Sequence, residues 1–388
     1  MSSEKHIVVQ KYGGSSVADP QKLKVVAELI KKKRDLGKRL CVVVSAMGQT
    51  TNDLLAKANE VSQAPSRREL DMLLSCGERA SMALLAMALE SLGVPSISFT
   101  GSQSGIITND QHSNARILEV RPYRVQDELA KDKVVIIAGY QGVSYKKEIT
   151  TLGRGGSDTT AVAMAAALEA EACEIYSDVD GVYTADPRVV TDAVPLSALS
   201  YDEMLSLSKG GARVLNAQAV AYAKEKNIAL YAKKTGSSHN GTIVLEEIVD
   251  GETQPWAFAH RDMVNSYQSP QQLSLTQGLK ALKDLEIEPL YWVHAGNSWC
   301  YLVAPEDAHG HQKLTVDGWS PMPPKGAITA VKGGLGQDLD TVTHLVRCVE
   351  EKSSPDQVHV TENSVTFVLQ SNHVQAVLSA MHHEFLVG

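Results

Sequence analysis

Three glycines, an arginine and an aspartate lie within one short segment, Thr150–Thr160. The segment follows the apolar stretch Lys133–Gly139, which we expect to be a strand, and precedes Ala161–Leu168, which has the composition of a helix. Glycines let backbone N–H groups approach an anion closely, and the amino end of a helix carries partial positive charge. Arg154 could bind a carboxylate or phosphate, and Asp158 could cap the helix or hold a metal or a hydrogen-bond donor. The pattern predicts an anion-binding turn; the plainer alternative is an ordinary turn with Asp158 as the helix cap.

A second glycine turn lies near the amino terminus, after the apolar stretch Ile7–Val9 and before a helix that Asp19 is expected to cap. Lys11 precedes the glycine pair Gly13–Gly14, so the segment matches neither of the common glycine-rich phosphate motifs. At the end of a strand, the Lys11 ammonium could reach a phosphate that lies over the glycines. The alternative is a turn with a solvated lysine.

A small-residue turn, Ser45–Thr51, comes directly after another predicted strand, Cys41–Val44. In open α/β sheets the carboxyl ends of the strands are where ligands bind. Farther along, a long predicted helix begins after Ser66 and is interrupted by Ser75–Arg79, where a glycine stands next to a charged pair. Such a local exception often marks a functional site, although the charged pair could simply face water.

Three aspartates follow the predicted strand Cys173–Ser177 within one long turn, at Asp178, Asp180 and Asp186. Carboxylates this close in sequence could bind Mg²⁺ or ribose hydroxyls. The alternative is an ordinary turn rich in aspartate, glycine and proline.

Predicted strands and helices alternate from residue 7 to about residue 245, which indicates an α/β fold: a three-layer sandwich with a mainly parallel sheet covered on both faces. The composition changes at about Ile248, and residues 250–272 are polar. We therefore predict two domains, 1–247 and 248–388. The second reads as two diverged α+β units, at about 255–320 and 325–388, each with a helix followed by two strands and joined near Pro321–Pro324.

The bulk composition is that of an ordinary globular protein of 388 residues, with 43% hydrophobic and 21% charged residues. The net charge of −8 favours neither nucleic acid nor an acidic membrane as a partner. No C-x-x-C pair occurs among the five cysteines, so we expect free thiols in a reducing compartment. The apolar runs are shorter than the ~20 residues that span a bilayer, and no cationic leader precedes the first strand. We expect a cytoplasmic protein with no membrane contact.

Five blocks, in this order, resemble the aspartate kinases of the amino-acid-kinase fold: Lys11–Asp19, Val44–Gly48, Cys76–Arg79, Gly153–Thr160 and Ser177–Arg188. The two C-terminal units resemble the paired ACT regulatory modules of that family. The resemblance implies transfer of the ATP γ-phosphoryl group to the side-chain carboxylate of L-aspartate. The products would be 4-phospho-L-aspartate and ADP, in the first step of the aspartate-derived amino acid pathway. It also implies a homodimer or higher oligomer and a possible amino-acid effector at the C-terminal units.

The same resemblance assigns roles to residues of the matching blocks. Lys11 and Asp158 would be catalytic, with Lys11 neutralising the transferred phosphoryl group and Asp158 orienting Lys11. The aspartate site would consist of Thr51, Glu78, Arg154 and Ser157, with Arg154 on the α-carboxylate and Glu78 on the ammonium group. The nucleotide side would consist of Lys11, Gly13, Gly14, Ser15, Ser45, Ser177, Asp178, Tyr183, Asp186, Arg188 and Arg213. Magnesium would arrive with ATP as Mg-ATP, and no side chain is assigned to it.

The sequence departs from the family pattern at several places. Arg213 stands where the family usually has a lysine, Asn216–Ala217 replaces a His-Pro pair, and Lys233–Gly236 lies where an Arg-Ser-Ser run is usual. Near Gln268–Pro270 the first C-terminal unit lacks the Asp-x-Pro-Gly turn that binds the feedback amino acid. The first three departures bear on ATP affinity and nucleotide choice, whereas the departure near Gln268–Pro270 predicts altered or absent inhibition by lysine and threonine. Two alternatives remain: a related kinase for another acid, such as glutamate or N-acetylglutamate, or a non-catalytic amino-acid sensor.

Overall fold

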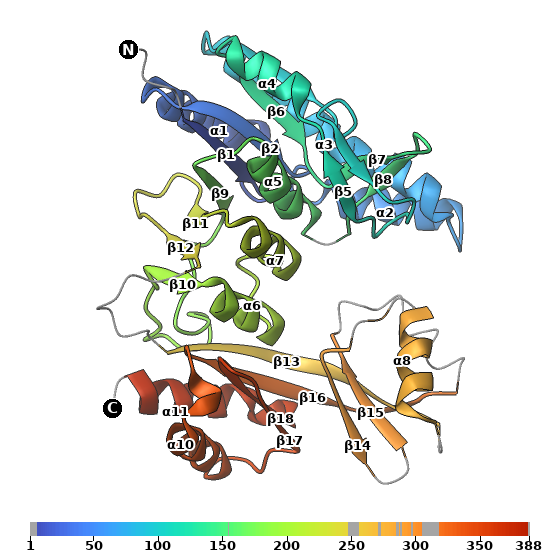
Figure 1. The fold of residues 1–388 in the computed structure, drawn as a ribbon, viewed down its shortest axis with the longest axis vertical. Helices are drawn as coiled ribbons and strands as arrows, with labels where there is room; N and C mark the ends of the chain where they lie inside the picture. Colours follow the sequence, from blue (N-terminus) through green and yellow to red (C-terminus); the bar gives the residue numbers. More distant parts are fainter. Residues whose placement is uncertain are drawn as a thin grey trace. The chain divides into compact units, whose positions relative to one another are not determined.

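The computed structural model describes residues 6–153, 155–246, 256–270, 273–284, 287, 289–295, 298–304 and 318–386. The chain forms two compact units (Figure 1). The first comprises residues 1–182, 195–205 and 213–252, and the second comprises 183–194, 206–212 and 253–388. The second unit therefore includes two short segments that the sequence prediction assigned to the first domain.

The first unit is built on an eight-stranded sheet with the order β10-β12-β11-β9-β1-β2-β6-β3. Its strands are β1 (Ile7–Tyr12), β2 (Arg39–Val44), β3 (Ser96–Phe99), β6 (Val134–Ala138), β9 (Ala172–Ser177), β10 (Ala198–Ser200), β11 (Leu230–Lys234) and β12 (Thr242–Leu245). Neighbouring strands run parallel except for β11 and β12, which are antiparallel. This confirms the mainly parallel sheet predicted from the alternating strands and helices.

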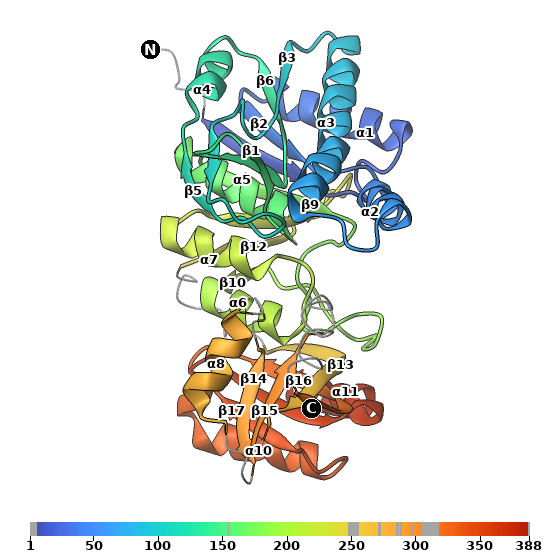
Figure 2. The same cartoon turned by 90° about the vertical axis from the view of Figure 1, so that its right-hand side faces the viewer.

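Helices cover both faces of this sheet (Figure 2). On one face α1 (Pro20–Asp35) and α3 (Arg67–Ser91) form a core with side chains such as Val8, Leu40 and Ile136. On the other face lie α4 (Tyr123–Ala130) and α5 (Gly156–Ala167), which contact β6 and β1 respectively. Successive side chains of a strand point to opposite faces, so both faces of the central strands are buried and apolar. The three-layer sandwich is therefore confirmed.

A smaller four-stranded sheet extends the first unit, with the order β5-β4-β7-β8. Its strands are β4 (Ile106–Thr108), β5 (Ile117–Val120), β7 (Gln141–Ser144) and β8 (Ile149–Thr151). The unit also contains α2 (Thr50–Val61), part of α6 (Tyr201–Gly210) and α7 (Ala217–Lys226). The sequence analysis missed β5, β7 and β8, which have three or four residues each and little apolar alternation.

The second unit contains a six-stranded antiparallel sheet with the order β14-β15-β13-β16-β18-β17. The strands are β13 (Ala257–Gln268), β14 (Tyr291–Ala295), β15 (Ser298–Val303), β16 (Ser320–Val331), β17 (Gln357–Val360) and β18 (Ser364–Gln370). Its longer helices are α8 (Leu275–Asp284), α10 (Leu339–Glu350) and α11 (Val374–Leu386). Both predicted repeats of helix, strand and strand are present, and they share one continuous sheet.

One strand of this unit was not predicted, and one expectation for the unit was wrong. The polar stretch 250–272 contains β13, a twelve-residue central strand whose buried residues include Phe258 and Val264. Pro321–Pro324 is not a joint between units, because it lies within β16. The ladder between β16 and β18 ends at Lys325, so β18 does not pair with the segment that contains the prolines. Because prolines lack an N–H group, they can lie in this segment without breaking a hydrogen bond to β18.

Helix α3 is long and apolar enough to cross a membrane when judged by length and composition alone. Within the first unit it packs against α1, α2, β3, β6 and β8. Leu85 and Leu89 are fully buried in the core shared with α1. We therefore assign α3 as a core helix.

The burial of α3 leads to a stability prediction. Leu85→Ala removes a fully buried side chain and should lower the free energy of unfolding of the first unit by about 2–5 kcal/mol. The Met87 side chain on the same helix is 59% exposed, so Met87→Ala should change the free energy of unfolding by less than about 0.5 kcal/mol. Urea titration followed by circular dichroism measures both. Equal effects of the two variants would contradict the assignment of α3 as a core helix.

Candidate active site

Lys11 and Asp158 form a nearly buried ion pair between the central sheet and α5. The Lys11 Nζ atom lies 2.6 Å from Asp158 Oδ1, and each side chain is 12% exposed. Lys11 is the residue of β1 that points toward α5, whereas its neighbours Gln10 and Tyr12 point to the opposite face. The helix cap of α5 is Gly155, with φ of +68°, so the alternative that Asp158 is the cap is wrong.

The two N-terminal turns predicted to bind phosphate lie against each other. The Ser45 N–H donates to the Tyr12 carbonyl over 3.1 Å, and the Gly48 N–H donates to the Gly14 carbonyl over 3.1 Å. A Cβ atom at Gly14 would lie 2.9 Å from the Ala46 carbonyl oxygen, so only glycine allows this approach. The turns at the ends of β1 and β2 therefore form one continuous loop surface.

Gly13 lies close to the lysine. A Cβ atom at Gly13 would lie 3.5 Å from Lys11 Nζ and 3.4 Å from the Tyr176 carbonyl oxygen. The Gly13 N–H already donates to that carbonyl over 3.0 Å. A Cβ atom at Gly13 would therefore make only ordinary contacts. Because the Gly13 N–H is already used, the amides of Gly14 and Ser15 are left as the candidate donors to a phosphate.

Glu78 reaches the same loop surface from α3. A Cβ atom at Gly77 would lie 2.7 Å from the Ala46 Cβ atom, so the helix can approach the loop only because residue 77 is glycine. The Glu78 Oε1 atom accepts a hydrogen bond from the Ala46 N–H over 3.1 Å. The residue is 3% exposed, so the alternative that it faces water is wrong.

The second oxygen of Glu78, Oε2, is buried and accepts no hydrogen bond from any residue that the structure describes. Burial raises the pKa of the Glu78 carboxyl to about 7, and this effect outweighs the hydrogen bonds from the backbone N–H groups of Glu78 and Ala46, which lower the pKa. A buried carboxylate with a free oxygen binds a cation favourably. Glu78 is therefore a candidate for binding an ammonium group.

The central glycine turn is held tightly on both sides of residue 154, but Arg154 itself lies outside the described residues. Gly153 has φ of +76°, and a Cβ atom there would lie 2.8 Å from Asn114 Oδ1. Gly139 faces Ser157, since a Cβ atom at Gly139 would lie 2.7 Å from Ser157 Oγ. Ser157 is buried in the first turn of α5 next to Asp158. Thr51 lies in the first turn of α2, partly exposed.

The residues predicted for the nucleotide side fall into two groups. The first group, Ser177, Asp178 and Arg213, belongs to the first unit. Ser177 is the last residue of β9, and its Oγ atom accepts a hydrogen bond from the Val179 N–H over 3.3 Å. The side chains of Asp178 and Arg213 are exposed. Tyr183, Asp186 and Arg188 belong to the second unit. There Arg188 forms an ion pair of 2.6 Å with Asp186, and its hydrogen bonds lower the pKa of that carboxyl.

Asp180 has one buried oxygen, Oδ1, without a hydrogen bond from the described residues, and its Oδ2 lies 3.6 Å from Lys234 Nζ. Across the described part of the chain, no group of three or more His, Cys, Asp or Glu side chains is placed to bind a metal ion. The three aspartates of this turn therefore do not form a metal centre by themselves.

Sequence reasoning missed Asp71 and Thr151, which support the central turn. Asp71 is fully buried on α3, seven residues before Glu78, and accepts a hydrogen bond of 2.6 Å from Thr151 Oγ1. Seven residues are two helical turns, so both carboxylates lie on the same face of α3. That spacing was the signal in the sequence that could have found Asp71.

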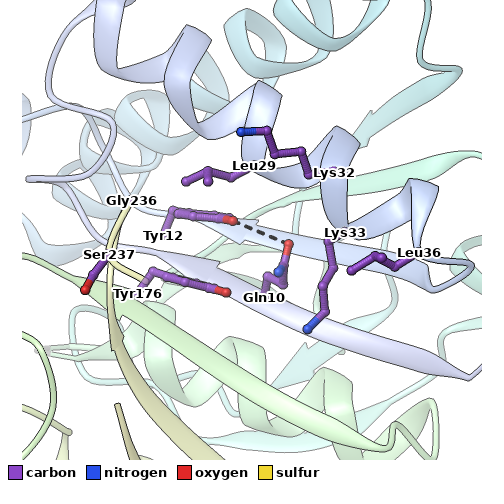
Figure 3. Close-up of a pocket in the computed structure, with 9 residues that line it drawn as sticks. All are labelled: Gln10, Tyr12, Leu29, Lys32, Lys33, Leu36, Tyr176, Gly236 and Ser237. Atoms are coloured by element: carbon purple, nitrogen blue, oxygen red, sulfur yellow. Dashed lines mark hydrogen bonds between the residues drawn. The ribbon is translucent and has the colours of Figure 1, made fainter. Parts of the chain in front are cut away.

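A pocket of about 180 Å³ lies on the other face of β1 (Figure 3). It is lined by residues that include Gln10, Tyr12 and Tyr176, and the two tyrosine rings stack with centroids 4.8 Å apart. Lys33, also on its wall, pairs with the buried Glu174 over 2.9 Å. Because Lys11 points away from this face, the pocket is separate from the site around the Lys11–Asp158 pair.

The protein-family model for the amino acid kinase family matches residues 6–232, more than half of the chain. The chain belongs to the amino acid kinase family. An aspartokinase from Mycolicibacterium smegmatis is 54% identical over 245 residues, which are 63% of this chain and 58% of that protein. Less than two thirds of this relative's length is therefore covered by the match.

Solved structures also resemble this amino acid kinase. The crystal structure of aspartate kinase from Synechocystis is 30% identical, with a TM-score of 0.58, over 98% of this chain and 69% of that one. E. coli aspartokinase III in complex with aspartate and ADP has a TM-score of 0.85 at 22% identity, over 98% of this chain and 100% of that one. Its complex with lysine and aspartate has a TM-score of 0.76 at 22% identity, over 98% of this chain and 99% of that one. At that identity the E. coli structures establish the fold, and together the comparisons confirm the resemblance drawn from the five sequence blocks.

The raised pKa of Glu78 predicts a pH dependence of stability. The folded carboxyl, with a pKa of about 7, holds its proton in a range where an unfolded glutamate, with its ordinary pKa of about 4.5, has lost it. Stability should therefore fall as the pH rises from about 4.5 to 7, by up to roughly 3 kcal/mol. Glu78→Gln should flatten this dependence in the ligand-free protein, as measured by urea unfolding at several pH values. A wild-type slope that persists in Glu78→Gln would contradict the assignment.

Proposed function

We propose that this amino acid kinase is an aspartate kinase. It transfers the γ-phosphoryl group of Mg-ATP to the side-chain carboxylate of L-aspartate and gives 4-phospho-L-aspartate and ADP. The observation that carries the proposal is the buried, unsatisfied Oε2 atom of Glu78 near the glycine turns. A site that offers a carboxylate without a partner is suited to an acceptor that brings an ammonium group, such as a free α-amino acid.

The Lys11–Asp158 pair supports phosphoryl transfer at the same place. In such a transfer the bond from the γ-phosphorus to the bridging oxygen of ADP breaks, while an oxygen of the acceptor carboxylate bonds to phosphorus. The acceptor needs no general base, because a carboxylate is already ionised at pH 7. The protein contributes positioning and neutralisation of charge. Lys11 supplies the positive charge, and Asp158, 2.6 Å away, holds its ammonium in place.

The remaining site residues take the roles that the family implies. Arg154 binds the α-carboxylate, and Thr51 and Ser157 complete the aspartate site. Gly14, Ser15 and Ser45 face the phosphates. Magnesium arrives bound to ATP. Ser177, Asp178 and Arg213 contact the nucleotide.

The second unit serves regulation and assembly in this proposal. Its antiparallel sheet, backed by α10 and α11, is built as a pair of helix–strand–strand repeats, as expected for ACT-like modules. E. coli aspartokinase III was solved in complex with lysine and aspartate, which supports an amino-acid effector in this proposal. The missing Asp-x-Pro-Gly turn near Gln268–Pro270 argues for weak or altered lysine and threonine inhibition. We also propose a homodimer and a cytoplasmic location.

The proposed reaction is tested by following ADP release with Mg-ATP and L-aspartate. L-Glutamate and N-acetyl-L-glutamate are run as alternative acceptors, and lysine and threonine as inhibitors. Turnover that depends on L-aspartate would support the proposal. Turnover with another acid alone would assign a related kinase, and no turnover with any acid would favour an amino-acid sensor.

A substitution tests the role of the buried lysine. Lys11→Met should lower kcat by about 10²–10³-fold, because it removes a preorganised positive charge from the transferring phosphoryl group. The KM for aspartate should change little. Lys33→Met is the matched control: this lysine lies on the other face of the sheet and shares Glu174 with Lys233, so activity should persist. Full turnover in Lys11→Met would refute the catalytic role of Lys11.

A further inference from the structure

Asp71 gathers hydrogen bonds from two segments that are far from α3 in sequence. Its Oδ1 atom accepts from Thr151 Oγ1 over 2.6 Å, from the Ser113 N–H over 3.0 Å and from Ser113 Oγ over 3.3 Å. Its Oδ2 atom lies 2.7 Å from His112 Nδ1 and 3.1 Å from the Ser113 nitrogen. The carboxylate is fully buried, and the His112 side chain, 19% exposed, lies over it.

These bonds tie the loop around Ser113 to the strand that leads into the central glycine turn. The Ala115 N–H donates to the Thr151 carbonyl over 2.8 Å. Asn114 Oδ1 occupies the space where a Cβ atom of Gly153 would lie. The backbone immediately before residue 154 is therefore held by the Asp71 network together with the pairing of β8 with β7 and the hydrogen bond from the Leu152 N–H to the Tyr140 carbonyl over 2.9 Å.

The position of Asp71 on α3 gives this network a function. Glu78 lies two helical turns farther along the same face, so one rigid helix carries both carboxylates. Glu78 offers its free oxygen to the site, while Asp71 uses its oxygens to hold the turn. The helix thereby sets the distance between the group that would bind an ammonium and the turn that would bind a carboxylate.

We propose that Asp71 is a positioning residue for the α-amino-acid site, acting through Thr151 on the turn 151–156. The proposal rests on the proposed aspartate kinase function. Its content is specific: the network fixes the described backbone of the turn, 151–153 and 155–156, relative to Glu78 on α3, and thus the recognition of the acceptor, without touching the acceptor. Loss of the network should weaken binding of the amino acid and leave binding of ATP almost unchanged.

Two neighbouring threonines of β8 provide a matched test. Thr151 and Thr150 are both fully buried, and they point to opposite sides of the strand. Thr150 Oγ1 bonds Thr108 Oγ1 over 2.6 Å and is not part of the Asp71 network. Thr151→Val and Thr150→Val each remove one buried hydroxyl with little change of shape, so both should destabilise the fold to a similar degree. Thr151→Ser keeps the hydroxyl, and Asp71→Asn keeps the shape of the carboxylate but places an amide NH₂ among the donors.

The experiment measures the KM values for L-aspartate and ATP, the melting temperature, and hydrogen exchange of the amides in 112–116 and 151–157. Thr151→Val and Asp71→Asn should raise the KM for aspartate by about 10-fold or more, with the KM for ATP changed less than about 2-fold. Thr151→Ser and Thr150→Val should stay near wild type in both constants. Hydrogen exchange in the two segments should be faster in Thr151→Val than in Thr150→Val.

The proposal is overturned if Thr151→Val and Thr150→Val change the KM for aspartate equally, or if neither changes it, because then the network contributes only stability. It is also overturned if the KM for ATP rises in parallel with that for aspartate. A wild-type protein without aspartate-dependent turnover would instead refute the proposed function. In that case the hydrogen-exchange rates of Thr151→Val and Thr150→Val alone decide whether Asp71 holds the turn. Equal exchange rates in the two variants would show that it does not.

Discussion

Three segments of the first unit meet at Ala46 with no room for another side chain. A Cβ atom at Gly14 would lie 2.9 Å from the Ala46 carbonyl oxygen, and one at Gly77 would lie 2.7 Å from the Ala46 Cβ atom. The Ala46 N–H is also the donor to Glu78. This close packing brings the end of β1, the end of β2 and the middle of α3 to one place. Any side chain at either glycine would push apart the elements that carry Lys11 and Glu78.

The alternation of side chains along β1 separates two kinds of chemistry. Lys11 faces α5 and pairs with Asp158, whereas Gln10 points to the other face and donates to the buried Glu174 over 2.8 Å. Burial by itself would raise the pKa of Glu174, but the hydrogen bond from Gln10 and the ammonium of Lys233 lower it to about 2. One face of the strand thus carries a fully compensated carboxylate that stabilises the fold. The opposite face carries an ammonium group at the end of the sheet where a ligand can reach it.

The sequence predicts the first unit well because its signals are local. Apolar runs, glycine turns and capping residues such as Asp19 predict the elements around Lys11 and Gly153, and the structure contains them. The central strand β13 escaped prediction because its polar residues, such as Arg261 and Asp262, disguise an alternation that only the neighbouring strands explain. Likewise, no local pattern shows that β16 is an edge strand at Pro321–Pro324. Its position in the sheet is a property of the whole unit.

The two buried carboxylates of α3 show what the sequence cannot reveal and the structure can. Asp71 and Glu78 are both buried from solvent, and both interrupt an apolar helix. Asp71 is surrounded by donors from the Ser113 loop and from Thr151, whereas Glu78 has an oxygen that no described residue satisfies. A buried carboxylate with complete hydrogen bonding organises its surroundings, and one with an empty position destabilises the protein until a cation fills it. Burial alone therefore does not distinguish a carboxylate that positions other residues from one that binds a ligand. The number of hydrogen-bond donors around each carboxylate distinguishes them.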